Sequence, residues 1–158
     1  MTPALLVQAI AEEITAAVKD YELKAEGQED KSVSVYQQHI PDEKFQDDSY
    51  YPLVIAAWQG SKDEDEGSTA TIGLTFGAYG SEPDAWMDRM SIMERVRQRL
   101  LENRLLKRRY RLALPTKWET IEEQPYPYWF GYATLNYQIG QPSERVPDSF
   151  YENMEEDT

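Results

Sequence analysis

Hydrophobic residues at helical spacing predict a helix near the N-terminus. From Leu6 to Val18 an apolar residue recurs every four positions, which places these side chains on one stripe of a helix. Thr2-Pro3 precedes the stripe, and this pair suits a cap followed by the first helical position. A helix is therefore predicted over residues 3–24.

A second and longer helix is predicted between Ser81 and Leu106. Ser81-Glu82-Pro83-Asp84 has the residue types of a helix start, because a serine cap, an acid three positions later and a proline in the first turn all favour that place. Apolar residues then recur at steps of three and four, at Trp86, Met90, Met93, Val96, Leu100, Leu101 and Leu105. Arginines, beginning with Arg89, occupy the other side, so the predicted helix has one apolar and one basic face.

Alternating and continuous apolar patterns predict five strands, at 32–36, 53–58, 69–79, 109–114 and 129–139. The segment 53–58 is a continuous apolar run, as in a strand that is buried on both faces. In 69–79 large apolar residues alternate with threonine and glycine, so one face should meet the core and the other could admit a second backbone. A charged connection, 62–67, should join these two strands into a hairpin.

The order of these elements is α-β-β-β-α-β-β, which predicts an α+β fold. We expect a mostly antiparallel sheet of about five strands with two helices packed on one face. A chain of 158 residues has the length of one domain. We assign that domain to residues 1–140, and we expect residues 141–158 to form an acidic, flexible C-terminal tail.

Charge is divided unevenly along the chain. Nine of the 16 Lys and Arg residues lie between positions 89 and 111, where Glu94 and Glu102 are the acidic residues. That window therefore has a charge of about +7, whereas the whole chain has −13, so the remainder has about −20. A net negative charge argues against nucleic acid as the main partner, because phosphate contacts need a dominant basic surface.

The sequence predicts no catalytic, cofactor-binding or metal-binding residues, and we expect the protein not to be an enzyme. Cysteine is absent, and His39 has neither a nucleophile motif nor an orienting acid near it in the sequence. The run Asp63 to Glu66 lacks the ligand spacing of a calcium loop, and no glycine-rich phosphate loop is present. No apolar run is long enough to span a bilayer, so no membrane contact is expected.

The arginine-rich helix has three possible interpretations. Its basic face could be solvated and paired with local acids, where an exposed ion pair contributes about 0–1 kcal/mol. It could contact DNA phosphates through Arg95, Arg99, Arg104, Arg108 and Arg109. It could also dock on an acidic surface of another copy of the chain, which accounts for both halves of the charge division.

The docking interpretation selects a set of interface candidates and two loops. The candidates are Arg89, Arg95, Arg99, Arg104, Arg108 and Arg109 on the basic side, and Asp63, Glu64, Asp65 and Glu66 on the acidic side. The loops at 42–50 and 61–67 are expected to become ordered on assembly.

Several segments, taken in order, resemble the tail-terminator and minor tail (head–tail joining) proteins of long-tailed bacteriophages and of related phage tail-like particles. The resemblance covers about residues 3–140 and includes the long amphipathic helix with its basic end. Its other segments are Val35-Tyr36-Gln37-Gln38-His39-Ile40-Pro41, Tyr51-Pro52-Leu53-Val54-Ile55, Phe76-Gly77-Ala78-Tyr79, Leu112-Ala113-Leu114-Pro115 with Trp118, and Gln124-Pro125-Tyr126-Pro127-Tyr128-Trp129-Phe130-Gly131.

The resemblance implies a structural virion protein of α+β fold. Such proteins form a ring, typically a hexamer, at the head-proximal end of the tail tube, where the ring ends tube polymerisation and joins the tail to the head. The implied partners are other copies of the chain, the tail tube protein, a head-side connector protein and, in a contractile tail, the sheath protein. The implied location is the virion tail, assembled in the host cytoplasm. A neighbouring head–tail joining or head-completion role stays open.

Overall fold

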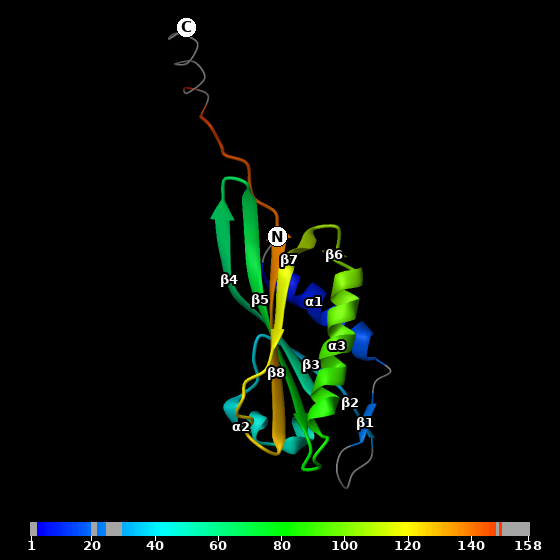
Figure 1. The fold of residues 1–158 in the computed structure, drawn as a ribbon. Helices are drawn as coiled ribbons and strands as arrows, with labels where there is room; N and C mark the ends of the chain where they lie inside the picture. The colour runs from blue at the N-terminus through cyan, green and yellow to red at the C-terminus, as the bar shows by residue number, and fades with distance from the viewer. Residues whose placement is uncertain (1–2, 20–21, 25–29, 148, 150–158) are drawn as a thin grey trace.

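The computed structural model describes residues 3–19, 22–24, 30–147 and 149 of the chain (Figure 1). The helices are α1 (Pro3–Val18), α2 (Asp42–Phe45) and α3 (Trp86–Glu102), with a 3-10 turn, η1 (Asp48–Tyr50). The strands are β1 (Glu22–Lys24), β2 (Asp30–Ser32), β3 (Ser34–Gln37), β4 (Leu53–Glu64), β5 (Gly67–Tyr79), β6 (Leu105–Leu106), β7 (Tyr110–Glu119) and β8 (Tyr128–Ile139). The predicted α+β class is confirmed.

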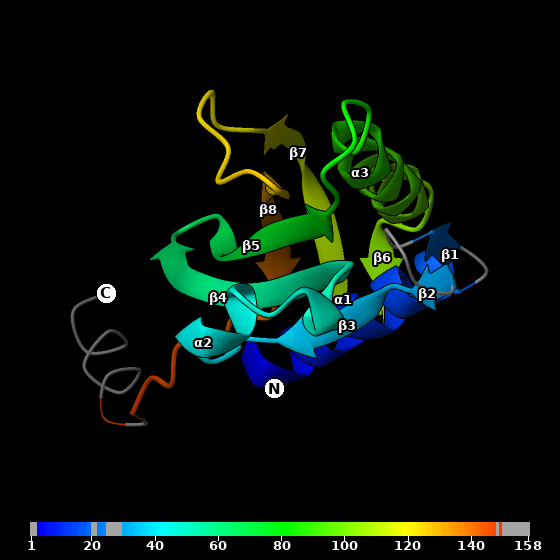
Figure 2. The same ribbon diagram turned by 90° about the horizontal axis from the view of Figure 1, so that it is seen from below.

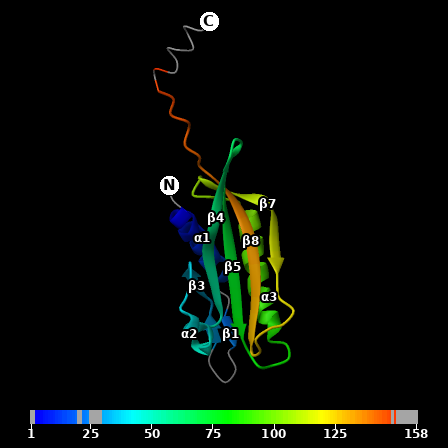
Figure 3. The ribbon, with the colours of Figure 1, turned by 90° about the vertical axis from the view of Figure 1, so that its left-hand side faces the viewer.

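The described residues form a six-stranded sheet in the order β3-β4-β5-β8-β7-β6, and β1 pairs with β2 separately. Figure 3 shows the long β4–β5 hairpin with β8 and β7 beside it. All pairs are antiparallel except β3 with β4, which the sequence analysis did not foresee. A parallel pair needs a crossover of about a dozen residues or more, and the segment holding α2 and η1 provides it.

One face of the sheet is covered by α1 and α3, as predicted, and the main core lies beneath them. In the view from below, both helices lie on one side of β5 and β8 (Figure 2). The alternation in β5 directs large side chains such as Ile72 and Phe76 into this core, where Leu135 of β8 joins them. Helix α1 contributes Leu6, Ile10 and Ile14, which are fully buried.

A second, smaller cluster lies around the α2–η1 segment and holds that segment in place. Tyr51 and Leu53 are buried there against Phe130 of β8. The Tyr51 hydroxyl donates to the Phe45 carbonyl at 2.8 Å, and the Tyr128 hydroxyl donates to the Gln46 carbonyl at 2.7 Å. The prediction that the loop at 42–50 becomes ordered only on assembly was therefore wrong, because aromatic packing within the chain already orders this segment.

Both long helices are shorter than predicted. Helix α1 ends at Val18, and β1 begins at Glu22 within the segment that the periodic pattern had assigned to the helix. Helix α3 begins at Trp86 after a turn, without a side-chain cap, and it ends at Glu102. At Asn103 the backbone leaves helical geometry while its N–H still donates to the Arg99 carbonyl.

The buried stripe of α3 is also rotated relative to the prediction. The residues that face the core are Arg89, Ile92, Val96 and Leu100, whereas Trp86 and Met90 are exposed. Steps of three and four fit both stripes, so periodicity could not separate them.

The β4–β5 hairpin extends through the predicted charged connection. Strand β4 continues to Glu64, and Glu64 pairs with Gly67 across a two-residue turn, Asp65-Glu66. Gly67 has a φ of 146°, which a residue with a side chain rarely adopts. The prediction of a loop at 61–67 that orders on assembly was therefore wrong, since these residues are paired strands and a tight turn.

Strand β7 likewise passes the residue that was predicted to end it. Pro115 lies in an irregularity between Ala113 and Lys117, after which pairing with β8 resumes up to Glu119. Proline is compatible with such a place because an interrupted ladder does not need its missing N–H.

Candidate assembly surfaces

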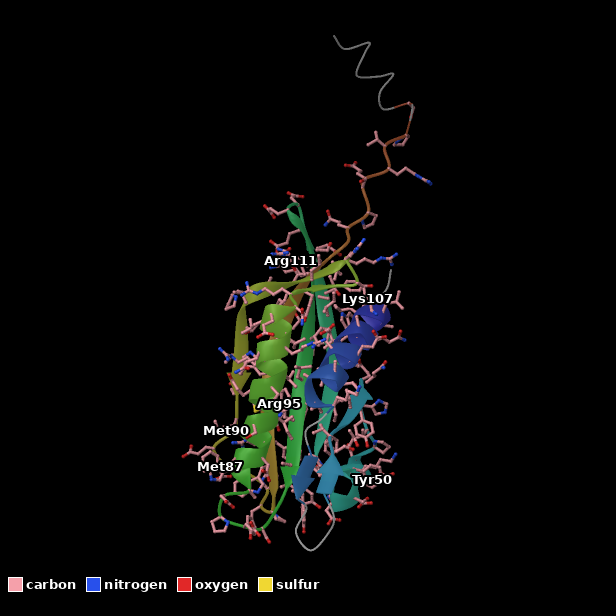
Figure 4. All side chains as sticks on the ribbon, turned by 90° about the vertical axis from the view of Figure 1, so that its right-hand side faces the viewer. Tyr50, Met87, Met90, Arg95, Lys107 and Arg111 are labelled. Carbon is pink, nitrogen blue, oxygen red and sulfur yellow. The ribbon has the colours of Figure 1, made fainter. Side chains whose placement is uncertain are left out.

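Exposed cations gather where α3 ends and β7 begins. Arg104, Lys107, Arg108, Arg109 and Arg111 are all exposed, and we call this surface the basic edge. Lys107 and Arg111 lie near the end of α3 in Figure 4. The chain reverses there because β6 pairs with the start of β7, with Leu106 opposite Tyr110. This short hairpin presents the cations on its turn and flanks.

The turn of the basic edge has an unusual backbone for its residues. Lys107 and Arg108 have φ values of 53° and 56°, and the Arg109 N–H donates to the Leu106 carbonyl at 3.0 Å. Two successive positive φ values favour Asn and Gly, because a β-carbon is disfavoured in that region. Two long cationic side chains are therefore held where local conformation does not favour them, a pattern that accompanies functional sites.

Carboxylates of the same chain neutralise part of the basic surface. Lys107 Nζ lies 2.7 Å from a Glu12 oxygen, and that bond raises the pKa of the lysine ammonium group. Arg99 Nε lies 2.7 Å from Glu13, and Arg97 lies 2.8 Å from Glu94. These pairs fasten α3 and the turn to α1, or lie within α3.

The remaining cations of the basic edge are not neutralised in this way. Arg104 Nε donates to a backbone carbonyl, that of Leu101, at 2.9 Å. Among the residues that the structure describes, Arg108, Arg109 and Arg111 have no carboxylate within ion-pair distance. The basic edge thus keeps a net positive charge.

The acidic counterpart lies at the tip of the β4–β5 hairpin. Asp63, Glu64, Asp65 and Glu66 are all exposed, and we call this surface the acidic tip. Asp63 accepts a hydrogen bond from the Ser68 hydroxyl at 2.6 Å, and Glu64 lies 3.5 Å from Lys62. With one lysine against four acids, this surface keeps a net negative charge.

Strand register places the two surfaces at the same end of the molecule. Arg111 is opposite Gln138, Gln138 is opposite Thr69, and Thr69 is opposite Lys62. The basic edge lies at β6 and β7, on one side of the sheet, and the acidic tip joins β4 to β5. From β7 to β4 is three strand spacings, or ~14 Å. The fold therefore presents opposite charges on two flanks of one end.

Arg89 does not belong to the basic edge, although it was predicted to lie on the basic face of the helix. It is only 6% exposed, and its Nη1 donates to the Phe130 carbonyl and the Thr120 hydroxyl, both at 3.0 Å. Its long side chain reaches β8 from the helix face that meets the sheet. Arg95 and Arg99 lie along α3, exposed and half-buried respectively.

An open strand edge, which no sequence pattern predicted, accompanies the charged surfaces. Among the described residues, strand β3 pairs with Leu53 to Ala56 of β4. At Trp58 the Gln38 side-chain amide takes the place of a strand, because it accepts from the Trp58 N–H at 3.0 Å and donates to its carbonyl at 3.2 Å. Beyond this point the outer side of β4 has no strand beside it among the described residues, and such an edge can pair with another chain.

The described residues contain no group of three or more His, Cys, Asp or Glu side chains placed to hold a metal ion. His39 is exposed, near the start of the α2–η1 segment. Among the described helices, none has both the length and the apolar character that a membrane crossing requires.

Among the comparisons with known proteins, only the comparison with solved structures gives a match. No family model and no curated protein matches the chain. Among solved structures, a chain from the virion of a native gene transfer agent particle resembles it, with 12% sequence identity and a TM-score of 0.45. The likeness covers 85% of this chain and 93% of the other.

The unfavourable turn provides a direct test. Arg108→Gly is expected to raise the free energy of unfolding by about 1 kcal/mol, because glycine adopts a positive φ without the cost of a β-carbon. Urea unfolding followed by circular dichroism measures the change. Arg109→Gly is the matched control, since Arg109 has no positive φ and should gain nothing. Equal effects of the two substitutions would contradict the interpretation of the turn.

Proposed function

We propose that this protein is a structural virion component of the tail-terminator type. In this proposal identical copies, six by the resemblance described above, form a ring on the head-proximal end of a tail tube. The ring ends tube polymerisation and offers its outer surface to a head-side connector protein. The tube protein and the connector are the expected partners, with a sheath protein added if the tail contracts.

The observation on which the proposal rests is the pair of opposite charges on two flanks of one end. A surface that meets a different, complementary surface on the next copy makes a head-to-tail contact. Such contacts close into a ring when the rotation between copies allows it, and they grow into a filament when it does not. The basic edge and the acidic tip fulfil this requirement because they differ in sign and do not neutralise each other within one copy.

The open edge of β4 supports the same proposal. It runs alongside the residues that lead to the acidic tip, from Gly60 to Glu64. A neighbouring copy could therefore add backbone hydrogen bonds to the electrostatic contact. Exposed charges would then bring copies together and select the register, and the strand edge would hold them.

Salt is expected to weaken the assembly in a measurable way. Light scattering at rising protein concentration should give a particle of several copies at low ionic strength, and a smaller one near 1 M salt, where the screening length falls to about 3 Å. The same measurement is repeated with tail tubes assembled from the tube protein of the same particle.

Electron microscopy of that mixture decides where the protein binds. A ring capping one end of the tube supports the terminator role, whereas binding only to a connector supports the neighbouring head–tail joining role. A protein that stays monomeric at high concentration and low salt, with tubes present, contradicts ring formation.

A further inference from the structure

An apolar groove lies between α3 and β7. It has a volume of about 220 Å³, and its apolar walls include Met90, Met93 and Trp118. Met90 is 51% exposed and Met87 is 50% exposed, so the apolar surface continues onto the first turn of α3 (Figure 4). Small-molecule pockets are typically ~300–1,000 Å³, so this groove fits a few side chains of a peptide better than a cofactor.

A buried cation lies at this groove, and no described residue supplies its counter-ion. Arg89 lines it and is only 6% exposed, and its Nε is buried with no partner among the described residues. The two oxygens that accept from its Nη1, on Thr120 and Phe130, are neutral. Burial lowers the pKa of the guanidinium, which still remains a cation at neutral pH. Burying a charge without an opposite charge is costly, so the arrangement suits an anion supplied from outside.

The acids of the groove do not supply that anion. Glu94 is 2.8 Å from Arg97, with which it pairs. Glu119 is 3.5 Å from Lys117. No ion pair to Arg89 occurs within the part of the chain that the structure describes.

We propose that the groove binds the C-terminal segment of a second copy of this chain, with Glu152 as the carboxylate that pairs with Arg89. The segment 150–154 reads Phe-Tyr-Glu-Asn-Met and lies outside the described residues. It contains one acid and three large side chains with apolar surface. This composition is complementary to a groove that has apolar walls and the single buried cation Arg89.

Chain length indicates why the segment comes from another copy. Strand β8 ends at Ile139, and the Gln141 amide donates to the Glu64 carbonyl at 2.9 Å, so the chain leaves the body beside the acidic tip. The groove lies at the level of Ala133, which is opposite Trp118, about 20 Å back along β8.

The described continuation increases this separation. Residues 142–147 lead away from the body (Figure 1). The five residues from position 147 to Glu152 span at most about 17 Å, which is too short to return to the groove of the same copy. The described residues thus leave the body on a course away from their own groove, so a groove on another copy is the one within reach of the proposal (Figure 1).

This inference goes beyond the proposed ring contact and uses different residues. Loss of the contact between basic edge and acidic tip would leave the groove and its cation in place. The two ideas can therefore fail separately, and an experiment on the groove tests only the second.

Disulfide cross-linking in the full chain tests the inference, because the natural sequence has no cysteine. One copy has Tyr151→Cys, and a second copy, enlarged by a tag, has Met90→Cys. After mixing and oxidation with copper phenanthroline, a covalent dimer of one tagged and one untagged copy should form. The control pairs Tyr151→Cys with Leu5→Cys, on the exposed side of α1, and should give at least tenfold less dimer.

Two outcomes of that experiment contradict the proposal. The first is an equal yield from the test pair and the control pair. The second is closure within a single chain that has both Tyr151→Cys and Met90→Cys, combined with no dimer from the mixed pair, which would assign the segment to its own groove.

Charge removal tests the pairing itself. Glu152→Gln in the copy that supplies the segment should lower the dimer yield about tenfold, and an unchanged yield contradicts the role of Glu152. Arg89→Met in the receiving copy should lower it similarly without lowering the melting temperature, because the Phe130 carbonyl keeps its bond from the Thr120 hydroxyl at 2.8 Å. If Arg89→Met does not fold, the result of Glu152→Gln alone decides.

Discussion

Copies in which Arg104, Arg108 and Arg109 are changed to Glu are expected to lose association with one another. The substitutions turn three cations of the basic edge into acids, so in the proposed ring this surface would repel the acidic tip of the next copy. Like charges placed together at an interface cost several kcal/mol. Size-exclusion chromatography with light scattering should therefore show monomers under conditions in which the natural chain assembles.

A second variant should restore association, and this distinguishes a specific contact from general repulsion. Asp63, Asp65 and Glu66 changed to Lys give a basic tip that is complementary to the reversed edge. A chain with both sets of substitutions should assemble again. Its net charge equals that of the natural chain, whereas each single set moves the net charge by six units in opposite directions.

A matched control keeps the charge change and moves it elsewhere. Lys19, Lys117 and Arg145 are exposed and lie outside the basic edge. Changing these three residues to Glu should leave assembly largely intact. Dissociation caused equally by the control set, or a failure of the double set to reassemble, would show that total charge rather than the two surfaces governs association.

Leu135→Ala is expected to produce the largest loss of stability. Leu135 is 0% exposed, and it lies in β8 opposite Ile72 of β5, in the core beneath both helices. Removing its side chain leaves a cavity and forfeits its burial, which together cost about 2–5 kcal/mol. A domain of this size has only about 5–15 kcal/mol of stability, so the variant should unfold at a much lower temperature.

The control for this variant is Leu114→Ala. Leu114 is 54% exposed on β7, so the same chemical change removes little burial. Its free energy of unfolding should change by less than about 0.5 kcal/mol. Thermal unfolding followed by circular dichroism compares the two. Similar melting temperatures would mean that the core does not depend on β8 as the packing indicates.

The sequence predicted element types better than element ends. A period of two in residues 69–79 identified β5 and its buried face, because side chains of a strand must alternate between core and exterior. The same alternation did not locate the end of the β4–β5 hairpin, since Lys62, Asp63 and Glu64 are strand residues without apolar side chains. Their conformation depends on backbone pairing with β5, which no periodicity reports.

For the charged surfaces too, the sequence showed which residues are charged, and the fold decided where they lie. The clustering of cations between positions 89 and 111 was visible in the sequence, as was the acidic run at 63–66. Their position on two flanks of one end follows from strand register, which links residues that are distant in the chain. The left-handed turn at Lys107 and Arg108 could not be predicted from the sequence either, because lysine and arginine are not residues that favour a positive φ.

Local pattern alone thus established an α+β chain with an amphipathic helix, a hairpin and separated charges, because these features depend on neighbours within a few residues. Long-range packing decided which side of α3 is buried, and with it the exposure of Met90 and the burial of Arg89. The reason is geometric: steps of three and four define adjacent stripes of a helix, and only contact with the sheet selects one of them.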